Sequence, residues 1–252
     1  MPTTVAEPVK VCLFAGPTLF AEPVPAGIDR YAPAALGSVF RAVEAGYGRV
    51  GIVDGCFGNM PSVWHKEILY AISRGVEVVG AASTGALRAA ELWPLGMLGL
   101  GRIFRLFRCG AWTDDDEVAV LHATRELGYR PLSDVMANIR FTLRALRRKG
   151  LISRAAEQDL NGRMKERHFS ERTAEELQRQ ARESLGRGAA DALIQAFRRE
   201  YIDVKRHDAR MLVKYLINQP PAPRLPAPRV FVATRHWRRQ FEKDIGDVPR
   251  LS

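Results

Sequence analysis

The chain has 252 residues, of which 46% are hydrophobic and 26% charged, a composition typical of a folded globular protein and not of a disordered one. Its three cysteines lie far apart and form no CxxC pair, which argues against a disulfide framework and a structural zinc site. No apolar run is long enough to cross a membrane, and the first residues lack the pattern of a secretory signal. We therefore expect a soluble, cytoplasmic protein.

The formal net charge of +10 is unevenly distributed. Residues 1–100 hold seven Lys or Arg and eight Asp or Glu, a net charge of −1, so residues 101–252 carry +11. Such asymmetry usually separates different tasks. The sequence predicts an α/β core over residues 1–130 and a basic, mainly helical part over residues 131–252. The second part contains a Pro-rich spacer at 220–228 and ends in a short docking tail.

The first half alternates short apolar runs with amphipathic segments. Strands are expected at residues 9–15, 49–54 and 76–82, and the segments after them have helical spacing of apolar residues. This rhythm predicts an α/β fold with a parallel-sheet core and flanking helices, followed by a mainly helical C-terminal part. Functional groups are expected at the carboxyl ends of the strands.

Further along the chain, a helix is expected from Gly101 and an edge strand at 118–122. The remaining pattern is helical. Its expected helices are residues 133–149, 153–167, 170–185 and 189–217.

Ser83 lies where the third predicted strand becomes a helix, in the stretch Ala81-Ala82-Ser83-Thr84-Gly85. A serine at such a turn is presented at the edge of the sheet, while the backbone N–H groups that follow can bind an oxyanion. A serine is also a common N-cap. Nucleophile and helix cap are therefore both open interpretations.

A nucleophilic serine needs a base, and this half offers His65, Lys66 and His122. Lys66 lies near the start of its helix, and burial beside Ser83 would lower its pKa and make it usable as a base. A solvated lysine is the alternative. Asp54 ends the second predicted strand, where it either faces a ligand, caps the following loop or pairs with His65.

Two further charged groups have alternative interpretations. Arg88 is three residues from Glu91 and either pairs with it or holds an anion above the sheet. The acidic run at 114–117 is typical of a solvated turn unless further ligands make it a metal site. The sequence has neither a P-loop nor a dinucleotide-binding glycine motif, and we expect no metal and no cofactor.

The basic half has a cluster of cations around Gly150: Arg144, Arg147, Arg148, Lys149 and Arg154. A helix-turn-helix that binds DNA is one interpretation, but no base-reading side chains stand out. A solvated helical face or a protein-docking face is more typical of such a run. We favour docking of a protein partner and disfavour nucleic acid.

Several stretches in the first 145 residues closely resemble the TfuA-like family in wording and order. They are FAGPT (14–18), GIVDG (51–55), PSVWHKEI (61–68), GAASTGALRAAE (80–91), DDDEVAV (114–120) and GYRPLS (128–133). One departure is Thr84, where the family would have Met.

The resemblance implies a partner of YcaO-type enzymes in thioamidation, the replacement of a peptide oxygen by sulfur in ribosomal peptides. Proteins of this family resemble hydrolases with a Ser-Lys pair and are linked to sulfide release from a thiocarboxylated, ubiquitin-fold carrier of the ThiS type. They also help the YcaO enzyme to engage its precursor peptide.

Carried onto this chain, the resemblance implies Ser83 as the nucleophile and Lys66 as the base. The backbone N–H groups of Thr84 and Gly85 would meet the developing negative charge, with Arg88 near the anionic substrate, and His65 and Asp54 complete the predicted site. The rival hypothesis is a non-catalytic module that recruits the YcaO enzyme or its peptide, with Ser83 only capping a helix. DNA binding is the weakest alternative.

Overall fold

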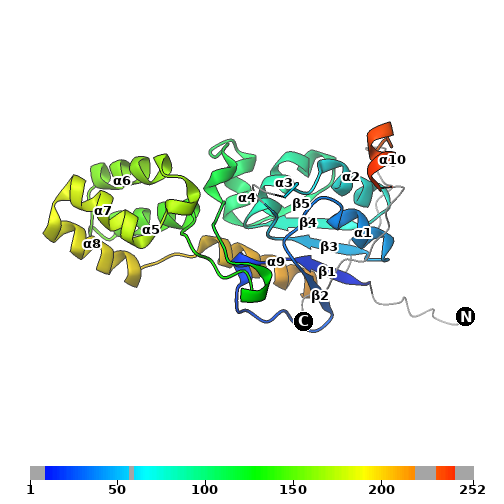
Figure 1. The fold of residues 1–252 in the computed structure, drawn as a ribbon, viewed down its shortest axis with the longest axis horizontal. Helices are drawn as coiled ribbons and strands as arrows, with labels where there is room; N and C mark the ends of the chain where they lie inside the picture. The colour runs from blue at the N-terminus through cyan, green and yellow to red at the C-terminus, as the bar shows by residue number, and fades with distance from the viewer. Residues whose placement is uncertain (1–8, 57–59, 219–230, 242–252) are drawn as a thin grey trace, which may run out of the picture.

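The computed structural model describes residues 9–56, 60–218 and 231–241. The molecule is elongated, with a sheet-containing core at one end and a cluster of helices at the other (Figure 1). The predicted Pro-rich spacer at 220–228 lies outside the described residues.

The core is built on a five-stranded sheet in which every neighbouring pair is parallel. The strand order is β2-β1-β3-β4-β5. The strands are β1 (Val11–Phe14), β2 (Ile28–Tyr31), β3 (Arg49–Ile52), β4 (Glu77–Ala81) and β5 (Leu98–Leu100). The predicted fold class, a parallel sheet with flanking helices and a helical C-terminal part, is confirmed.

Strand β1 shows how the sequence divides the core into two layers. Successive side chains of a strand point to opposite faces. Cys12 and Phe14 pack into one buried cluster, whereas Leu13 and Ala15 pack into another. Both faces of the sheet are therefore covered, as a parallel sheet requires.

Different helices cover the two faces. On one side lie α1 (Ser38–Glu44), α2 (His65–Ser73) and α3 (Thr84–Leu92), which contribute Val39, Ile68 and Ala86 to the larger cluster. On the other side lies α9 (Val204–Asn218), whose Leu212 and Leu216 pack onto the sheet. A helix that lies more than 100 residues after the last strand in sequence thus completes the core.

Helix α4 (Gly101–Arg108) is anchored by α9. Asp208 on α9 accepts a hydrogen bond from the Ile103 N–H at 2.8 Å and so satisfies a donor in the first turn of α4. Gly101 has φ +94°, and a Cβ there would overlap the Asp208 carboxyl group. Glycine is required at this close approach.

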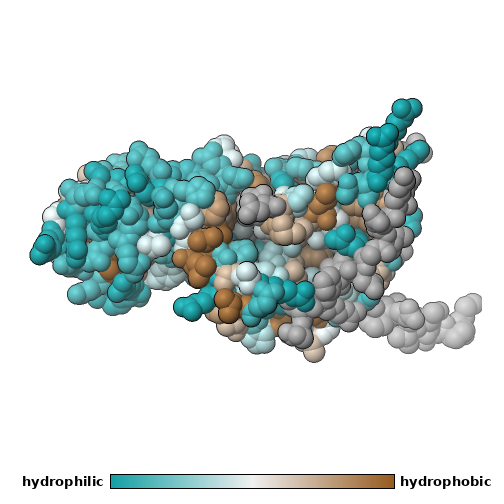
Figure 2. Space-filling view, in the orientation of Figure 1, coloured by the Kyte–Doolittle hydropathy of each residue, from teal (hydrophilic) through white to brown (hydrophobic). Residues whose placement is uncertain are grey.

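Four helices form a separate lobe with its own apolar core: α5 (Met136–Arg148), α6 (Arg154–Glu166), α7 (Ala174–Leu185) and α8 (Arg187–Arg199). Leu143, Leu160, Leu177 and Leu193 are among its buried residues. The lobe's visible surface is almost entirely hydrophilic (Figure 2). We call residues 136–199 the helical lobe.

The structure differs from the sequence-based prediction at several places. Strands β2 and β5 are not among the expected strands. The expected helix 189–217 is divided into α8 and α9, because Asp203 accepts a hydrogen bond from the Arg206 N–H at 2.9 Å and starts a new helix. The expected strand at 118–122 does not form. A 3₁₀ turn, η3 (Asp115–Glu117), leads into this segment, and His122 makes only an isolated bridge with Pro131.

A short C-terminal helix, α10 (Arg235–Phe241), lies against the core. Its Trp237 and Phe241 are buried against Phe40 of α1, with ring centroids 5.6 and 4.8 Å away. Residues 204–218 and 235–241 thus both pack on the α/β core, although they follow the helical lobe in sequence.

Candidate active site

Ser83 lies in a tight turn between β4 and α3. Ala82 before it has φ +66°, a left-handed conformation that is rare outside glycine, and such strain often occurs at functional sites. The helix start approaches the sheet so closely that a Cβ at Gly80 or Gly85 would overlap backbone carbonyl groups, of Gly85 and Ile52 respectively. The small residues of the motif are therefore required by the turn.

Ser83 occupies the N-cap position of α3 but its side chain makes no capping hydrogen bond. Its Oγ donates instead to the carbonyl oxygen of Val118, at 3.5 Å. Only 2% of the residue is exposed. Capping therefore does not explain the serine in this structure.

Lys205 on α9 reaches the same carbonyl oxygen. Its Nζ donates to Val118 O at 2.8 Å, and the residue is 2% exposed. Desolvation lowers the pKa of its ammonium group, while Asp54, with Oδ1 4.0 Å from Nζ, partly opposes this effect. A serine hydroxyl and a buried lysine thus meet at one oxygen atom.

Asp54, directly after β3, is 1% exposed and holds the loop that follows β1. Its Oδ2 accepts hydrogen bonds from the N–H groups of Gly16 (2.8 Å) and Thr18 (3.0 Å), and the Thr18 hydroxyl donates to Oδ1. Asp54 therefore organises the loop and places a negative charge beside Lys205. Its partner at the site is this lysine, and His65 lies elsewhere.

The start of α3 offers one set of free donors. The Gly85 N–H is engaged with the carbonyl oxygen of Val53 at 3.2 Å. The Thr84 hydroxyl is buried and has no hydrogen-bond partner among the described residues, and its N–H likewise has no acceptor there. Thr84, at the N-terminus of a helix, is thus the residue with donors available for a developing negative charge.

His65 and Lys66 point to other partners. Lys66 Nζ donates to the Thr234 hydroxyl at 3.1 Å, just before α10. His65 Nε2 lies 2.7 Å from Glu91 Oε2, and Arg88 Nη1 lies 2.8 Å from the same carboxylate oxygen. No hydrogen bond between Lys66 and Ser83 is present among the described residues.

A pocket of about 930 Å³ opens beside the start of α3. Thr84, Leu87 and Arg88 form the α3 side of this pocket. The other walls are Cys56 and residues 60–62 after β3, residues 113–116, and Lys165 from the helical lobe. We call it the Thr84 pocket. It leads from solvent to the residue next to Ser83.

The acidic run at 114–117 is bound by cations of the helical lobe. Lys165 Nζ contacts Asp114 (3.1 Å), Asp116 and Glu117 (3.1 Å). Arg172 donates to Asp116 at 2.6 Å, and Arg140 forms a two-point pair with the buried Glu117 at 2.8 Å. Three of these carboxylates are close enough to hold a metal ion, but Lys165 lies among them.

Lys205 was missed by sequence reasoning, although a signal was present. It shares one helical face with Ala209, Leu212 and Leu216, which are spaced four, seven and eleven residues further on. A lysine on the buried stripe of a helix needs a polar partner in the core. His122 is also placed away from Ser83: its Nδ1 lies 2.8 Å from the Ala123 carbonyl oxygen.

The sequence was also compared with models of known protein families. The family model described as TfuA-like protein matches residues 54–173, from Asp54 through the Ser83 turn and into the helical lobe. The resemblance to the TfuA-like family is thereby confirmed. No curated protein is significantly similar to the chain.

The match to the TfuA-like family supports an accessory role in YcaO-related thioamidation, since the family pairs with YcaO-type proteins. Within the described residues, the chain has no helix that is both long and apolar enough to cross a membrane.

Proposed function

We propose that this TfuA-like protein hydrolyses a thiocarboxylated, ubiquitin-fold carrier of the ThiS type and releases sulfide for a YcaO-type enzyme. Ser83 is the nucleophile, and Lys205 takes the role of the base. The observation that carries this proposal is the common contact of Ser83 Oγ and Lys205 Nζ with the Val118 carbonyl oxygen.

In the first step, the Ser83 oxygen attacks the thiocarboxylate carbon at the end of the carrier. Lys205 must be neutral to take the Ser83 proton, and desolvation, which lowers the pKa of its ammonium group, favours the neutral amine. The carbon–sulfur bond then breaks, and the departing sulfur takes the proton from Lys205. Hydrosulfide and an acyl-serine result.

In the second step, water cleaves the acyl-serine. Lys205 again serves as the base, and the products are the carrier's carboxylate and free Ser83. The negative charge that develops on the acyl oxygen in each step is met by the free donors of Thr84. One such donor is typically worth about a hundredfold or more in rate.

The Thr84 pocket gives the carrier's tail a route to the serine. Arg88 lines this pocket and supplies a positive charge for the thiocarboxylate, although it also pairs with Glu91. The Thr84 pocket ends at the tight turn between β4 and α3, so it would admit a carrier tail that has no bulky side chains. His65 and Lys66 then belong to the surface around α2 and α10, away from the reacting groups.

The test supplies purified thiocarboxylated carrier and measures sulfide release by the wild type and three variants. Ser83→Ala and Lys205→Met are expected to lose about a thousandfold or more in kcat, because each removes a reacting group. Lys66→Met is the matched control and is expected to stay within a few-fold of the wild type. Thermal unfolding of each variant checks that the fold is intact.

If Lys66→Met loses activity and Lys205→Met retains it, Lys66 is the base. If all folded variants release sulfide at the wild-type rate, the hydrolase assignment is wrong. The alternative, a non-catalytic module that recruits the YcaO enzyme or its peptide, would then be favoured.

A further inference from the structure

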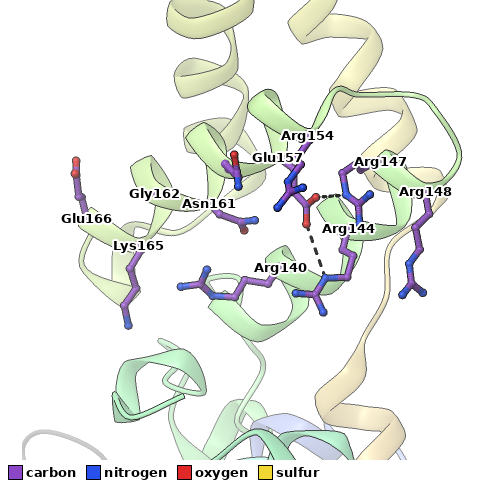
Figure 3. A pocket seen from close by; sticks show the side chains of 11 residues that line it. Arg140, Arg144, Arg147, Arg148, Arg154, Glu157, Asn161, Gly162, Lys165 and Glu166 are labelled. Carbon is purple, nitrogen blue, oxygen red and sulfur yellow. Dashed lines mark hydrogen bonds and ion pairs between the residues drawn. The ribbon is translucent and has the colours of Figure 1, made fainter. Parts of the chain in front are cut away.

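A groove of about 940 Å³ between α5 and α6 of the helical lobe is lined mainly by cationic side chains. Glu157 on α6 points toward Arg144 and Arg147 on α5, whereas Arg148 and Glu166 point away from this contact (Figure 3). Six cationic and two acidic side chains line the groove, a net charge of +4. The cations are Arg140, Arg144, Arg147, Arg148, Arg154 and Lys165. We call it the arginine groove.

Ion pairs neutralise part of this charge, because Arg140 and Lys165 already contact the acidic run at 114–117. Glu157 is shared by Arg147 and Arg144, and the Arg144 contact is long, at 3.8 Å, with 54% of that side chain exposed. Arg148 and Arg154 are exposed and have no acidic partner within the described residues. The groove therefore presents at least three guanidinium groups to an incoming partner.

The arginine groove adjoins the Thr84 pocket. Lys165 lines both, and its Nζ lies among the carboxylates of Asp114 and Asp116, which form one wall of the pocket. A molecule bound in the groove would therefore lie next to the entrance of the Thr84 pocket, with only Lys165 between them. This position distinguishes the groove from a charged surface that serves only solubility.

We propose that the arginine groove docks an acidic face of the carrier protein while the carrier's C-terminal tail enters the Thr84 pocket. This inference rests on the proposed function, because it names the surface that recruits the substrate. Guanidinium groups bind carboxylates through paired hydrogen bonds, so several exposed arginines suit a face rich in Asp and Glu.

A protein partner fits the groove better than nucleic acid. Glu157 and Glu166 stand among the cations and would repel a phosphate backbone, whereas a protein face can place its own cations against them. The hydrophilic surface of the lobe in Figure 2 also favours a polar interface that forms quickly and depends on salt.

The test measures binding of the carrier in its carboxylate form, so that no turnover occurs. The double variant Arg144→Glu/Arg148→Glu reverses two exposed charges of the groove and leaves Glu157 paired with Arg147. Its matched control, Arg198→Glu/Arg199→Glu, makes the same charge change on α8, outside the groove. Kd is expected to rise at least about tenfold for the groove variant and less than about twofold for the control.

A second measurement separates docking from chemistry. Hydrolysis of a small thioacid, thioacetate, is expected to be equal in the wild type and the groove variant, whereas KM for the thiocarboxylated carrier rises about tenfold with kcat unchanged. Ser83→Ala is expected to bind the carrier as the wild type does. If no protein, including the wild type, releases sulfide but the carrier still binds through the groove, the proposed function is wrong and the docking proposal stands.

Equal carrier affinity in the wild type and the groove variant would overturn the docking proposal. So would an equal loss of affinity in the α8 control, because net charge and not the groove would then decide binding. If labelled duplex DNA binds the wild type but not the groove variant, and the carrier binds neither, the groove serves nucleic acid.

Discussion

The α/β core and the helical lobe use polar residues in opposite ways. In the core, Ser83, Asp54 and Lys205 are each at most 2% exposed. They contact backbone groups or one another. In the lobe, charged residues are numerous and exposed and form ion pairs across the surface. The lobe belongs to the part of the sequence that carries the net positive charge.

This difference separates two kinds of function. Burial changes the chemistry of a group, because desolvation shifts the pKa of an amine or carboxyl group. Exposure preserves the charge and lets it act on a partner, with a strength that depends on salt. The comparison therefore predicts that the core is sensitive to single substitutions and to pH, and that the lobe tolerates most of them.

Arg172 is expected to be the strongest exception to the tolerance of the lobe. It is 1% exposed and donates to the carbonyl oxygens of Met164 (3.0 Å) and Asp116 (2.8 Å) and to the Asp116 carboxylate. Arg172→Met is expected to reduce the free energy of unfolding by about 3 kcal/mol or more, because buried acceptors lose their donor. Urea unfolding measures this.

The matched control is Arg179→Met, on the exposed surface of the same lobe. Arg179 is 52% exposed and pairs with Glu176 and Glu183. Its loss is expected to leave the free energy of unfolding nearly unchanged, because exposed ion pairs are screened by solvent. Equal effects of the two substitutions would show that burial does not distinguish the lobe's ion pairs.

Gly85→Ala tests the tight packing of the core. A Cβ at this position would overlap the Ile52 carbonyl oxygen, so the sheet and α3 must separate, at a cost of about 1–3 kcal/mol. Gly162→Ala in α6 is the control: a Cβ there meets nothing within 4 Å, and alanine is expected to stabilise the helix by up to about 1 kcal/mol. Thermal unfolding should move in opposite directions.

The pH dependence of sulfide release tests whether the buried Lys205 of the core acts as the base. Lys205 acts as a base only when neutral, so kcat should rise with pH, about tenfold per unit below the folded-state pKa. Burial places that pKa below the ordinary value of 10.5, so the plateau is reached earlier than for a solvated lysine. Residual activity of Lys205→Met should lack this rise. An unchanged profile in that variant would exclude Lys205 as the titrating group.

Two serines at helix starts are expected to show the smallest difference in stability when each is replaced by alanine. Ser153 caps α6 and accepts a hydrogen bond from the Ala156 N–H at 3.1 Å, so Ser153→Ala is expected to cost about 1 kcal/mol. Ser83 makes no such bond, and Ser83→Ala should leave stability within about 0.5 kcal/mol of the wild type. A larger loss at Ser83 would revive its interpretation as a helix cap.

The sequence predicted those parts of the fold that depend on local pattern. Strands β1, β3 and β4 and the Ser83 turn follow from apolar runs and small residues, and the lobe helices from their spacing of apolar positions. Strands β2 and β5 are too short and too weakly patterned to be predicted in this way. The Lys205 contact depends on a helix that returns to the sheet after the entire lobe, and no local spacing encodes this return. The strand expected at 118–122 also failed for a tertiary reason, since ion pairs to Arg140, Lys165 and Arg172 hold the adjoining acidic turn.

The ribosome completes the Ser83 turn long before it reaches Lys205, because α9 follows the entire lobe in the chain. A nascent chain without α9 leaves one face of the sheet uncovered at Leu13, Val53 and Val79, and has no amine beside the serine. In the proposed mechanism, Ser83 therefore gains its base only when α9 closes the core. Folding of α9 onto the sheet would then coincide with activation of the serine.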